Sequence, residues 1–537
     1  MNHSRPDRSP ATRRLMRALV SVLALTCIVL ALLQLWRVEA GVESERSWVG
    51  PTPVTVYRPI PERLDSFADR WNVDRSGGLP VVLISHGFAG SQQLMEAFAF
   101  ALAREGYIAV SFDYYGHGRN LEPLAGDVTD VDGATRFLLD QTRKVADFAL
   151  ALPDAGRDFA ILGHSMASDI IVRYSKADPR VDATIAVSLF SPAVTATSPE
   201  NFLIIVGALE GFLRQEALRV VGLVTDEPEA GTTYGRFDDG SARRAVFAPG
   251  VEHVGVLYSR TSLREAVDWL NRSFGRAADV STDPIRTPGP AILLLFAGLL
   301  LLAWPLARWL PRVADPALGL NPGWRELLPA ALVPAVATPL LLVAFPADFM
   351  GILVGGYLAV HFALYGIITS AFCLWIRRRR PGASAAVRRS RRPISAVLAA
   401  VAAILYAAGA FGMAMDHFVT SFAVTEPRLP LLAMMLGGTL IYFLADEMLT
   451  RGPSVPRGAH LLTRVCFLLS LGLAVAMSFE ELFFLLIIAV VIIPYFLVYG
   501  LIGGWVYRAT GDPIVSALPS AVAFGWALAV VFPQMSG

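Results

Sequence analysis

The sequence has few charged residues and few cysteines for its length. Only 17% of its 537 residues are Asp, Glu, Lys or Arg. The mean hydropathy of +0.51 excludes a protein that is soluble throughout. The three cysteines, Cys27, Cys373 and Cys466, all fall in apolar stretches. The polar part of the chain therefore needs no disulfide, and cysteine usage does not name its compartment.

Lysine is almost absent. Lys144 and Lys176 are the only two lysines among the 46 basic residues. This bias towards arginine indicates a genome of high GC content and a bacterial source, and it says nothing about mechanism.

Apolar stretches long enough to span a membrane account for the high hydropathy. About 20 apolar residues are required for one span. The first stretch, Leu15 to Trp36, exceeds the roughly 7 to 15 apolar residues of a signal peptide. We therefore predict an uncleaved signal anchor, although Val38-Glu39-Ala40 offers a weak cleavage site. Eight more spans are predicted near 290–310, 327–345, 349–376, 394–415, 429–447, 462–477, 482–504 and 514–533.

The chain divides at changes in composition. We predict a cytoplasmic N-terminus over 1–14, the anchor over 15–36, and a polar domain over 51–276. A linker over 277–290, rich in Asp, Thr, Pro and Gly, leads to a membrane domain over 291–537.

Arginine placement predicts the orientation, because positive charge near span ends stays in the cytoplasm. The N-terminus and alternate loops carry the arginines, so the polar domain should lie outside. We expect a multi-pass protein of the bacterial inner membrane. The arginine-rich loop over 377–392 is interpreted as a topology signal facing anionic lipid, and no nucleic-acid partner is predicted. The arginines on the cytoplasmic side are Arg5, Arg8, Arg13, Arg14, Arg17, Arg308, Arg312, Arg325, Arg377 to Arg380, Arg388, Arg389, Arg391, Arg392, Arg451, Arg457, Arg464 and Arg508.

The most informative motif lies within Phe159–Ser168. A short apolar run ends in Gly163-His164-Ser165-Met166-Ala167, and a helical pattern follows at once. This layout predicts a nucleophile elbow, in which a strand turns sharply into a helix and exposes a serine hydroxyl. Small residues two positions before and after Ser165 are needed because neighbouring chains approach closely. Ala167 stands where glycine is usual.

The segments before the elbow follow a recognisable order. The strand pattern Val81–Ser85 leads into His86-Gly87-Phe88-Ala89-Gly90-Ser91 and a helical pattern to Arg104. The strand pattern Tyr107–Phe112 leads into Asp113-Tyr114-Tyr115-Gly116-His117-Gly118. Together with the elbow, these motifs resemble the α/β-hydrolase superfamily over roughly 51–276. The resemblance implies an α/β fold with a doubly wound, mostly parallel sheet, fused here to an all-α polytopic membrane domain.

A serine nucleophile needs a base and an acid to orient that base. His253 is the only histidine between Ser165 and the next predicted span, and it follows a last-strand pattern. The chain order of this fold places the acid after the preceding strand, Asn201–Val206, which favours Glu210. Four other acids remain alternatives to Glu210, namely Glu216, Asp226, Glu227 and Glu229.

The oxyanion hole is predicted to use the backbone N–H groups of Met166 and Phe88, with Gly87 as the alternative to Phe88. By the resemblance, His86, His117 and His164 are structural or oxyanion-loop residues. They lie on separate loops, so no metal and no cofactor is predicted. The expected chemistry is attack on an acyl bond, an acyl-enzyme and hydrolysis, as in an esterase, lipase or peptidase. The short connection Ser191–Glu200 leaves no room for a large lid there. The expected partners are the lipid bilayer and an acyl-containing small molecule, lipid or cell-envelope substrate.

The membrane half shows a fainter resemblance. Asp446 to Gly452 and Gly500 to Gly511 are similar to parts of the CPBP family of intramembrane proteases related to CAAX prenyl proteases. That family uses acidic residues and helix-borne histidines to hold a metal. Here only His460 follows Arg451, in a predicted loop, so we expect an inactive relative. The alternative function for the whole chain is a transporter or scaffold with a hydrolase-fold accessory domain.

Overall fold

The computed structural model describes residues 9–62, 78–127, 131–276, 285–344, 354–379 and 391–536. The chain forms two compact units, which we call the sheet unit and the helical unit. The sheet unit comprises Ala31–Leu293, Asp416–Thr425 and Pro533–Gly537. The helical unit comprises Met1–Leu30, Leu294–Met415 and Glu426–Phe532. Two short segments from far downstream in the sequence therefore belong to the sheet unit.

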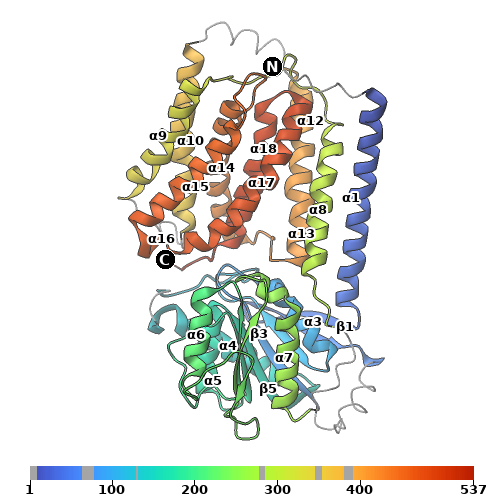
Figure 1. Ribbon diagram of the computed structural model, residues 1–537, viewed down its shortest axis with the longest axis vertical. Coiled ribbons are helices and arrows are strands. Elements are labelled where there is room, and N and C mark those ends of the chain that lie inside the picture. Colours follow the sequence, from blue (N-terminus) through green and yellow to red (C-terminus); the bar gives the residue numbers. More distant parts are fainter. Residues whose placement is uncertain are drawn as a thin grey trace. The chain divides into compact units, whose positions relative to one another are not determined.

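The sheet unit is built on a mostly parallel sheet with helices packed around it (Figure 1). In the described part of the chain, this sheet has nine strands in the order β1-β2-β4-β3-β5-β6-β7-β9-β8. Strands β3 to β7 and β9 run parallel, while β1, β2 and β8 pair antiparallel at the two edges. The strands are β1 Val42–Val49, β2 Thr52–Pro59, β3 Leu79–Ser85, β4 Ile108–Phe112, β5 Ala155–His164, β6 Ala183–Val187, β7 Phe202–Gly207, β8 Thr233–Tyr234 and β9 Arg243–Ala248.

Helices cover both faces of this sheet. One core contains residues of α4, α5 and α6, and the other contains residues of α3 and α7. The central strands are buried on both faces, which explains their continuous apolar runs. The helical elements here are η2 Gln92–Met95, α3 Glu96–Arg104, the π-helical η3 Val131–Thr135, α4 Arg136–Leu150, α5 Met166–Ala177, α6 Gly211–Val221, η4 Gly255–Tyr258 and α7 Arg260–Ser273.

The predicted fold class is confirmed, with local differences. The sheet begins at Val42, before the expected boundary at residue 51. The strand β1 was not predicted because it is largely exposed and has no apolar alternation. The helical pattern Gln92–Arg104 is divided into the 3₁₀ turn η2 and the helix α3. Most of the predicted linker, residues 277–284, lies outside the described residues.

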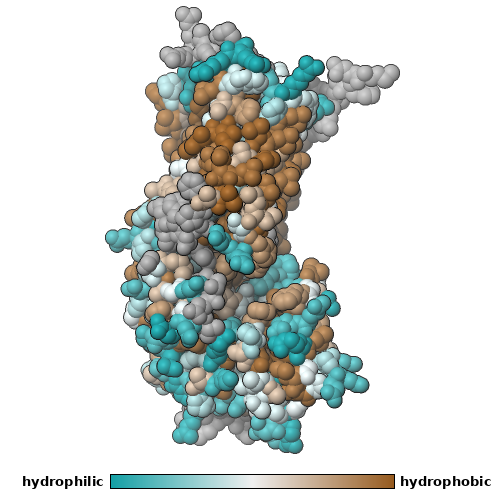
Figure 2. Space-filling view, turned by 90° about the vertical axis from the view of Figure 1, so that its left-hand side faces the viewer, coloured by the Kyte–Doolittle hydropathy of each residue, from teal (hydrophilic) through white to brown (hydrophobic). Residues whose placement is uncertain are grey.

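The helical unit carries the apolar stretches. Nine helices in the described part of the chain are long and apolar enough to cross a membrane. Figure 2 shows a broad hydrophobic surface over this unit. Among its apolar side chains, Leu332, Ile394, Leu469 and Leu497 are each more than half exposed. A membrane-spanning unit accounts for so much exposed apolar surface. Its elements are α1 Pro10–Glu39, α8 Gly289–Ala307, α9 Trp324–Leu342, α10 Gly355–Arg378, α12 Pro393–Ile404, the π-helical η6 Leu405–Ala410, α13 Phe411–Phe418, η7 Glu426–Arg428, α14 Leu429–Thr450, α15 Ala459–Met477, α16 Phe479–Leu482, α17 Phe484–Thr510 and α18 Pro513–Val531.

Glycines allow the closest helix crossings in the helical unit. A Cβ at Gly438 of α14 would lie 2.4 Å from the carbonyl oxygen of Ala359 in α10. A Cβ at Gly366 of α10 would lie 2.6 Å from the backbone nitrogen of Tyr442 in α14. Without a hydrophobic driving force inside a bilayer, such close backbone packing is what holds helices together.

Candidate active site

The serine elbow joins the end of β5 to the start of α5. Ser165 has φ 55° and ψ −118°, a strained conformation for a residue with a side chain. Its N–H donates to the carbonyl of Val187 at the end of β6 (2.9 Å), which fixes the turn against the sheet. A Cβ at Gly163 would lie 2.9 Å from the carbonyl oxygen of Ala167, so a glycine is required there.

The structure brings Ser165, His253 and Glu210 together. His253 Nε2 lies 2.9 Å from Ser165 Oγ, and His253 Nδ1 lies 2.6 Å from Glu210 Oε1. These residues follow β5, β9 and β7, three parallel strands whose carboxyl ends share one edge of the sheet. The Glu210 side chain is 6% exposed, whereas the His253 ring is 36% exposed. The acid is thus shielded from water, and the imidazole stays accessible.

Glu210 is held by two further hydrogen bonds. Its Oε2 accepts one from the backbone N–H of Gly207 (2.6 Å) and one from the hydroxyl of buried Ser188 (2.9 Å). These donors stabilise the charged carboxylate and fix its rotamer. Sequence reasoning missed Ser188, because nothing in its neighbourhood distinguishes it from any other serine at a strand end.

The four alternative acids take other positions. Glu216 pairs with Arg219 on α6 (2.7 Å). The alternative acids are Glu216, Asp226, Glu227 and Glu229. Among the described residues, none of these four forms a hydrogen bond or an ion pair with His253.

The loop after β3, His86–Ser91, lies directly beside Ser165, and we call it the oxyanion loop after the role that the sequence predicts for Phe88. A Cβ at Gly87 would lie 2.9 Å from Ser165 Cβ. The Phe88 ring meets the His117 ring edge-on, with centroids 6.0 Å apart. Met166 opens α5, and among the described residues its backbone N–H has no acceptor. The helix N-terminus adds a partial positive charge beside Ser165.

Two buried histidines support this arrangement. His164 Nε2 donates to the carbonyl oxygen of His253 (2.9 Å), which positions the loop that carries the imidazole. Burial, reinforced by the neighbouring His253 ring, holds the pKa of His164 well below its usual value. His86 Nε2 accepts the N–H of Tyr114 (3.1 Å), and burial also lowers the pKa of His86. Both rings stay neutral at physiological pH.

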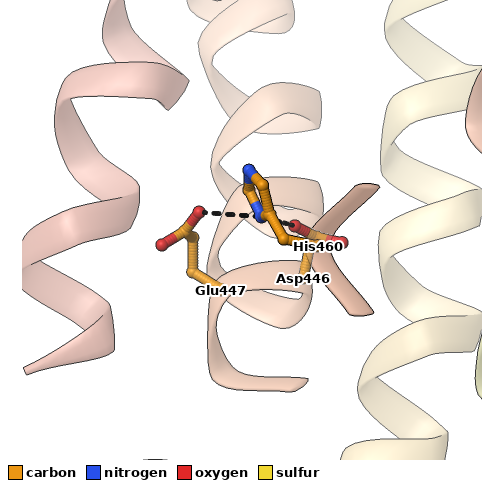
Figure 3. Close-up of side chains that lie close together, drawn as sticks. All are labelled: Asp446, Glu447 and His460. Carbon is orange, nitrogen blue, oxygen red and sulfur yellow. Dashed lines mark ion pairs between the residues drawn. The ribbon is translucent and has the colours of Figure 1, made fainter. Parts of the chain in front are cut away.

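The helical unit contains a second cluster of titratable residues, shown in Figure 3. Ligand atoms of Asp446, Glu447 and His460 lie within 4.8 Å of one another. His460 lies at the start of α15, not in a loop, so the expectation that no helix carries an imidazole here was wrong. The two carboxylates are buried rather than at an exposed helix end.

This cluster does not fit a metal ion. Arg464 Nη2 lies 2.9 Å from Asp446 Oδ2, and Arg451 Nε lies 2.9 Å from Glu447 Oε2. The two guanidinium groups already neutralise both carboxylates and would repel a cation. His460 Nε2 lies 3.4 Å from Arg451 Nη2, so it faces a donor. The arrangement is an ion-pair network that satisfies buried charges.

One part of the chain is similar to a known protein family. Residues 79–225 match the family model described as serine aminopeptidase, S33. No curated protein matches the sequence. The solved structures that resemble it include a hypothetical protein from Pseudomonas aeruginosa (13% identity, 44% of this chain and 95% of that chain, TM-score 0.32). An epoxide hydrolase from Vigna radiata is 19% identical over 28% of this chain and 42% of that chain (TM-score 0.21). The family match does not extend into the helical unit.

Proposed function

Since residues 79–225 match a serine hydrolase family, we propose that the sheet unit is a serine hydrolase that cleaves an acyl bond. The observation that carries this proposal is the continuous hydrogen-bonded chain Ser165–His253–Glu210. Three side chains from distant parts of the sequence lie within the hydrogen-bond distances that activation of a serine hydroxyl requires.

Each residue then has one role. His253 Nε2 takes the proton of Ser165 Oγ as the oxygen attacks the carbonyl carbon, and it returns the proton to the leaving group. Glu210 keeps Nδ1 protonated and stabilises the imidazolium. The N–H groups of Phe88 and Met166 stabilise the developing oxyanion. Water then hydrolyses the acyl-enzyme, with His253 again acting as the base.

Apolar side chains support an apolar acyl substrate. Leu209 and Val254 are neighbours of Glu210 and His253 in the sequence, and they are 67% and 42% exposed. Phe190 and Phe212 are also more than half exposed, and their rings pack with centroids 5.8 Å apart. Exposed apolar groups close in the sequence to the catalytic residues favour a lipid or lipid-like ester as the substrate. An amide is the alternative substrate, since the matched family is described as a serine aminopeptidase.

The location of the site follows from the arginine distribution. With the N-terminal arginines in the cytoplasm, the sheet unit faces the extracytoplasmic side of a bacterial inner membrane. Protease added to spheroplasts should then degrade the sheet unit. Protection of this unit in intact spheroplasts, with degradation only after lysis, would reverse the orientation.

The test of the activity is covalent labelling. A fluorophosphonate probe should label the full-length protein in membranes, and Ser165→Ala should abolish labelling. Ser168→Ala is the matched control, because Ser168 lies one helical turn into α5 and its Oγ accepts the Phe190 N–H. Equal labelling of the native protein and Ser165→Ala would overturn the proposal.

A further inference from the structure

The oxyanion loop must hold its donor within a narrow range of positions. Oxyanion donors act at about 2.7 to 3.1 Å, and a displacement of about 1 Å lowers the rate by about 10². The loop is short, and Ala89 within it has φ 57°, which is unfavourable for alanine. Contacts from outside the loop must therefore maintain its conformation.

The end of the oxyanion loop is held by residues that come more than three hundred positions later. Ser91 is fully buried, and its Oγ accepts the backbone N–H of Ser421 (2.9 Å). The same Oγ lies 3.0 Å from the hydroxyl of Thr420. Residues 416–425, which we call the clamp segment, run from the last turn of α13 to the residue before η7 and belong to the sheet unit.

Asp416 organises the clamp segment. Its Oδ1 accepts the backbone N–H groups of Phe422 (2.7 Å) and Ala423 (3.2 Å), which closes the segment on itself. Its Oδ2 forms an ion pair with Arg119 Nη2 (2.7 Å). One carboxylate thus shapes the segment and attaches it to the sheet unit.

Buried Asp113 connects these contacts back to the oxyanion loop. Its Oδ2 accepts the N–H of Arg119 (2.9 Å), and its Oδ1 accepts the N–H of Gln92, the residue after Ser91 (2.8 Å). These hydrogen bonds and the backbone between them form a closed ring. The ring runs from Ser91 through the clamp segment, Arg119 and Asp113 to Gln92, which is bonded covalently to Ser91.

The last residues of the chain hold the neighbouring loop. Gln534 donates its backbone N–H to the carbonyl of Gly116 (3.0 Å) and accepts the N–H of Leu124 (2.8 Å). Gly116 precedes His117, whose ring meets that of Phe88. Gly116 has φ +74°, and a Cβ there would lie 2.4 Å from the Gln534 carbonyl oxygen, so only glycine allows this contact.

We propose that the clamp segment positions the oxyanion hole, with Asp416 and Ser91 as positioning residues. This inference rests on the proposed hydrolase activity. The clamp segment belongs to the sheet unit, although it lies in the sequence between the apolar helices α13 and α14. A short insertion between two membrane-type helices thus supplies part of the active-site framework. Removing the clamp should impair stabilisation of the transition state and leave ground-state binding of the ester intact.

The experiment compares Asp416→Asn and Ser91→Ala with the native full-length protein in nanodiscs. With p-nitrophenyl butyrate as substrate, each variant should lower kcat by about 10- to 100-fold, a part of the loss caused by deleting one oxyanion donor, and change KM less than threefold. The affinity for butylboronic acid, which forms a tetrahedral adduct, should fall by the same factor as kcat. Asp238→Asn, which removes an exposed Asp–Arg pair, is the matched control and should keep the native kcat.

The outcomes separate the two proposals. If Ser165→Ala retains the activity, the hydrolase proposal itself fails. If Ser165→Ala is inactive but both clamp variants keep kcat within twofold of Asp238→Asn, or change only KM, the positioning role is overturned. The melting temperature measured by tryptophan fluorescence identifies misfolding, and Ser91→Ala provides the test if Asp416→Asn does not fold.

Discussion

Replacing Glu210 with glutamine tests how the acid controls His253. The carboxylate accepts three hydrogen bonds, one from His253 Nδ1 and two on the other oxygen, from Ser188 and Gly207. Glutamine has one oxygen and one NH₂ group, so it cannot accept all three. The Gly207 N–H is a backbone donor and cannot reverse its role. The amide should therefore turn its oxygen to Gly207 and its NH₂ to His253, which places the proton on Nε2 and prevents Ser165 from being deprotonated.

The size of the expected loss of kcat follows from the free energy of the alternative rotamer of Gln at position 210. Turning the amide oxygen to His253 restores the productive tautomer but leaves the buried Gly207 N–H without an acceptor, at about 1 to 3 kcal/mol. The productive state is then populated about 5- to 150-fold less. Loss of the negative charge beside the imidazolium weakens that hydrogen bond by about 1 kcal/mol more, roughly another fivefold to tenfold. Multiplied together, the two factors predict that kcat falls by about 25- to 1,500-fold.

The assay is hydrolysis of p-nitrophenyl butyrate by the purified full-length protein. Glu216→Gln and Glu229→Gln are matched controls, since both were alternative acids, and both should keep kcat within twofold. An unchanged melting temperature excludes unfolding. A Glu210→Gln protein with kcat within tenfold of the native value would refute the role of Glu210. A large loss of kcat in Glu216→Gln or Glu229→Gln would assign that role to the residue replaced in that control.

Two further predictions concern the surroundings of the site. Gly87→Ala should lower the rate of fluorophosphonate labelling at least tenfold, because its Cβ would lie 2.9 Å from Ser165 Cβ and 3.0 Å from the His164 carbonyl oxygen; labelling at the native rate would show that the loop can yield. Stability should fall as pH drops below about 6.5, because burial holds the pKa of His164 well below its usual value, so the unfolded chain binds a proton that the folded chain does not. His164→Gln keeps an N–H donor for the His253 carbonyl and should reduce the loss of melting temperature between pH 8 and pH 5.5. An equal loss in both proteins would mean that folding does not lower the pKa of His164, which would refute this prediction.

Local patterns, together with the family resemblance that their motifs carry, were enough to predict the class of the fold. Continuous apolar runs of five or six residues indicated buried strands, and these are β3, β4, β5 and β7. The parallel arrangement of these strands was implied by the resemblance to the α/β-hydrolase superfamily. Apolar stretches of about 20 residues indicated the long helices in the same direct way. The exposed strand β1 was missed, because its pairing with β2 depends on a partner and not on its own pattern.

The catalytic residues of the candidate site could be predicted from the sequence, but the residues that hold them in place could not. Ser165 stands in a motif, and the chain order of the fold directed attention to His253 and Glu210. The contacts of Ser188 with Glu210 and of His164 with the His253 carbonyl had no local signature, because a hydrogen bond between distant residues leaves no periodic trace. For the same reason, the position of His460 beside Asp446 and Glu447 was not foreseen.

The sequence by itself determined which segments are apolar enough for a membrane, which serine lies on a strained turn, and which strands are buried, since each depends on neighbouring residues. Only the tertiary structure decided that Glu210 is the acid bonded to His253, and that a segment near residue 420 and the last residues of the chain brace the loops beside Ser165. Such contacts join residues hundreds of positions apart, and their geometry exists only once the sheet has brought those residues to one edge.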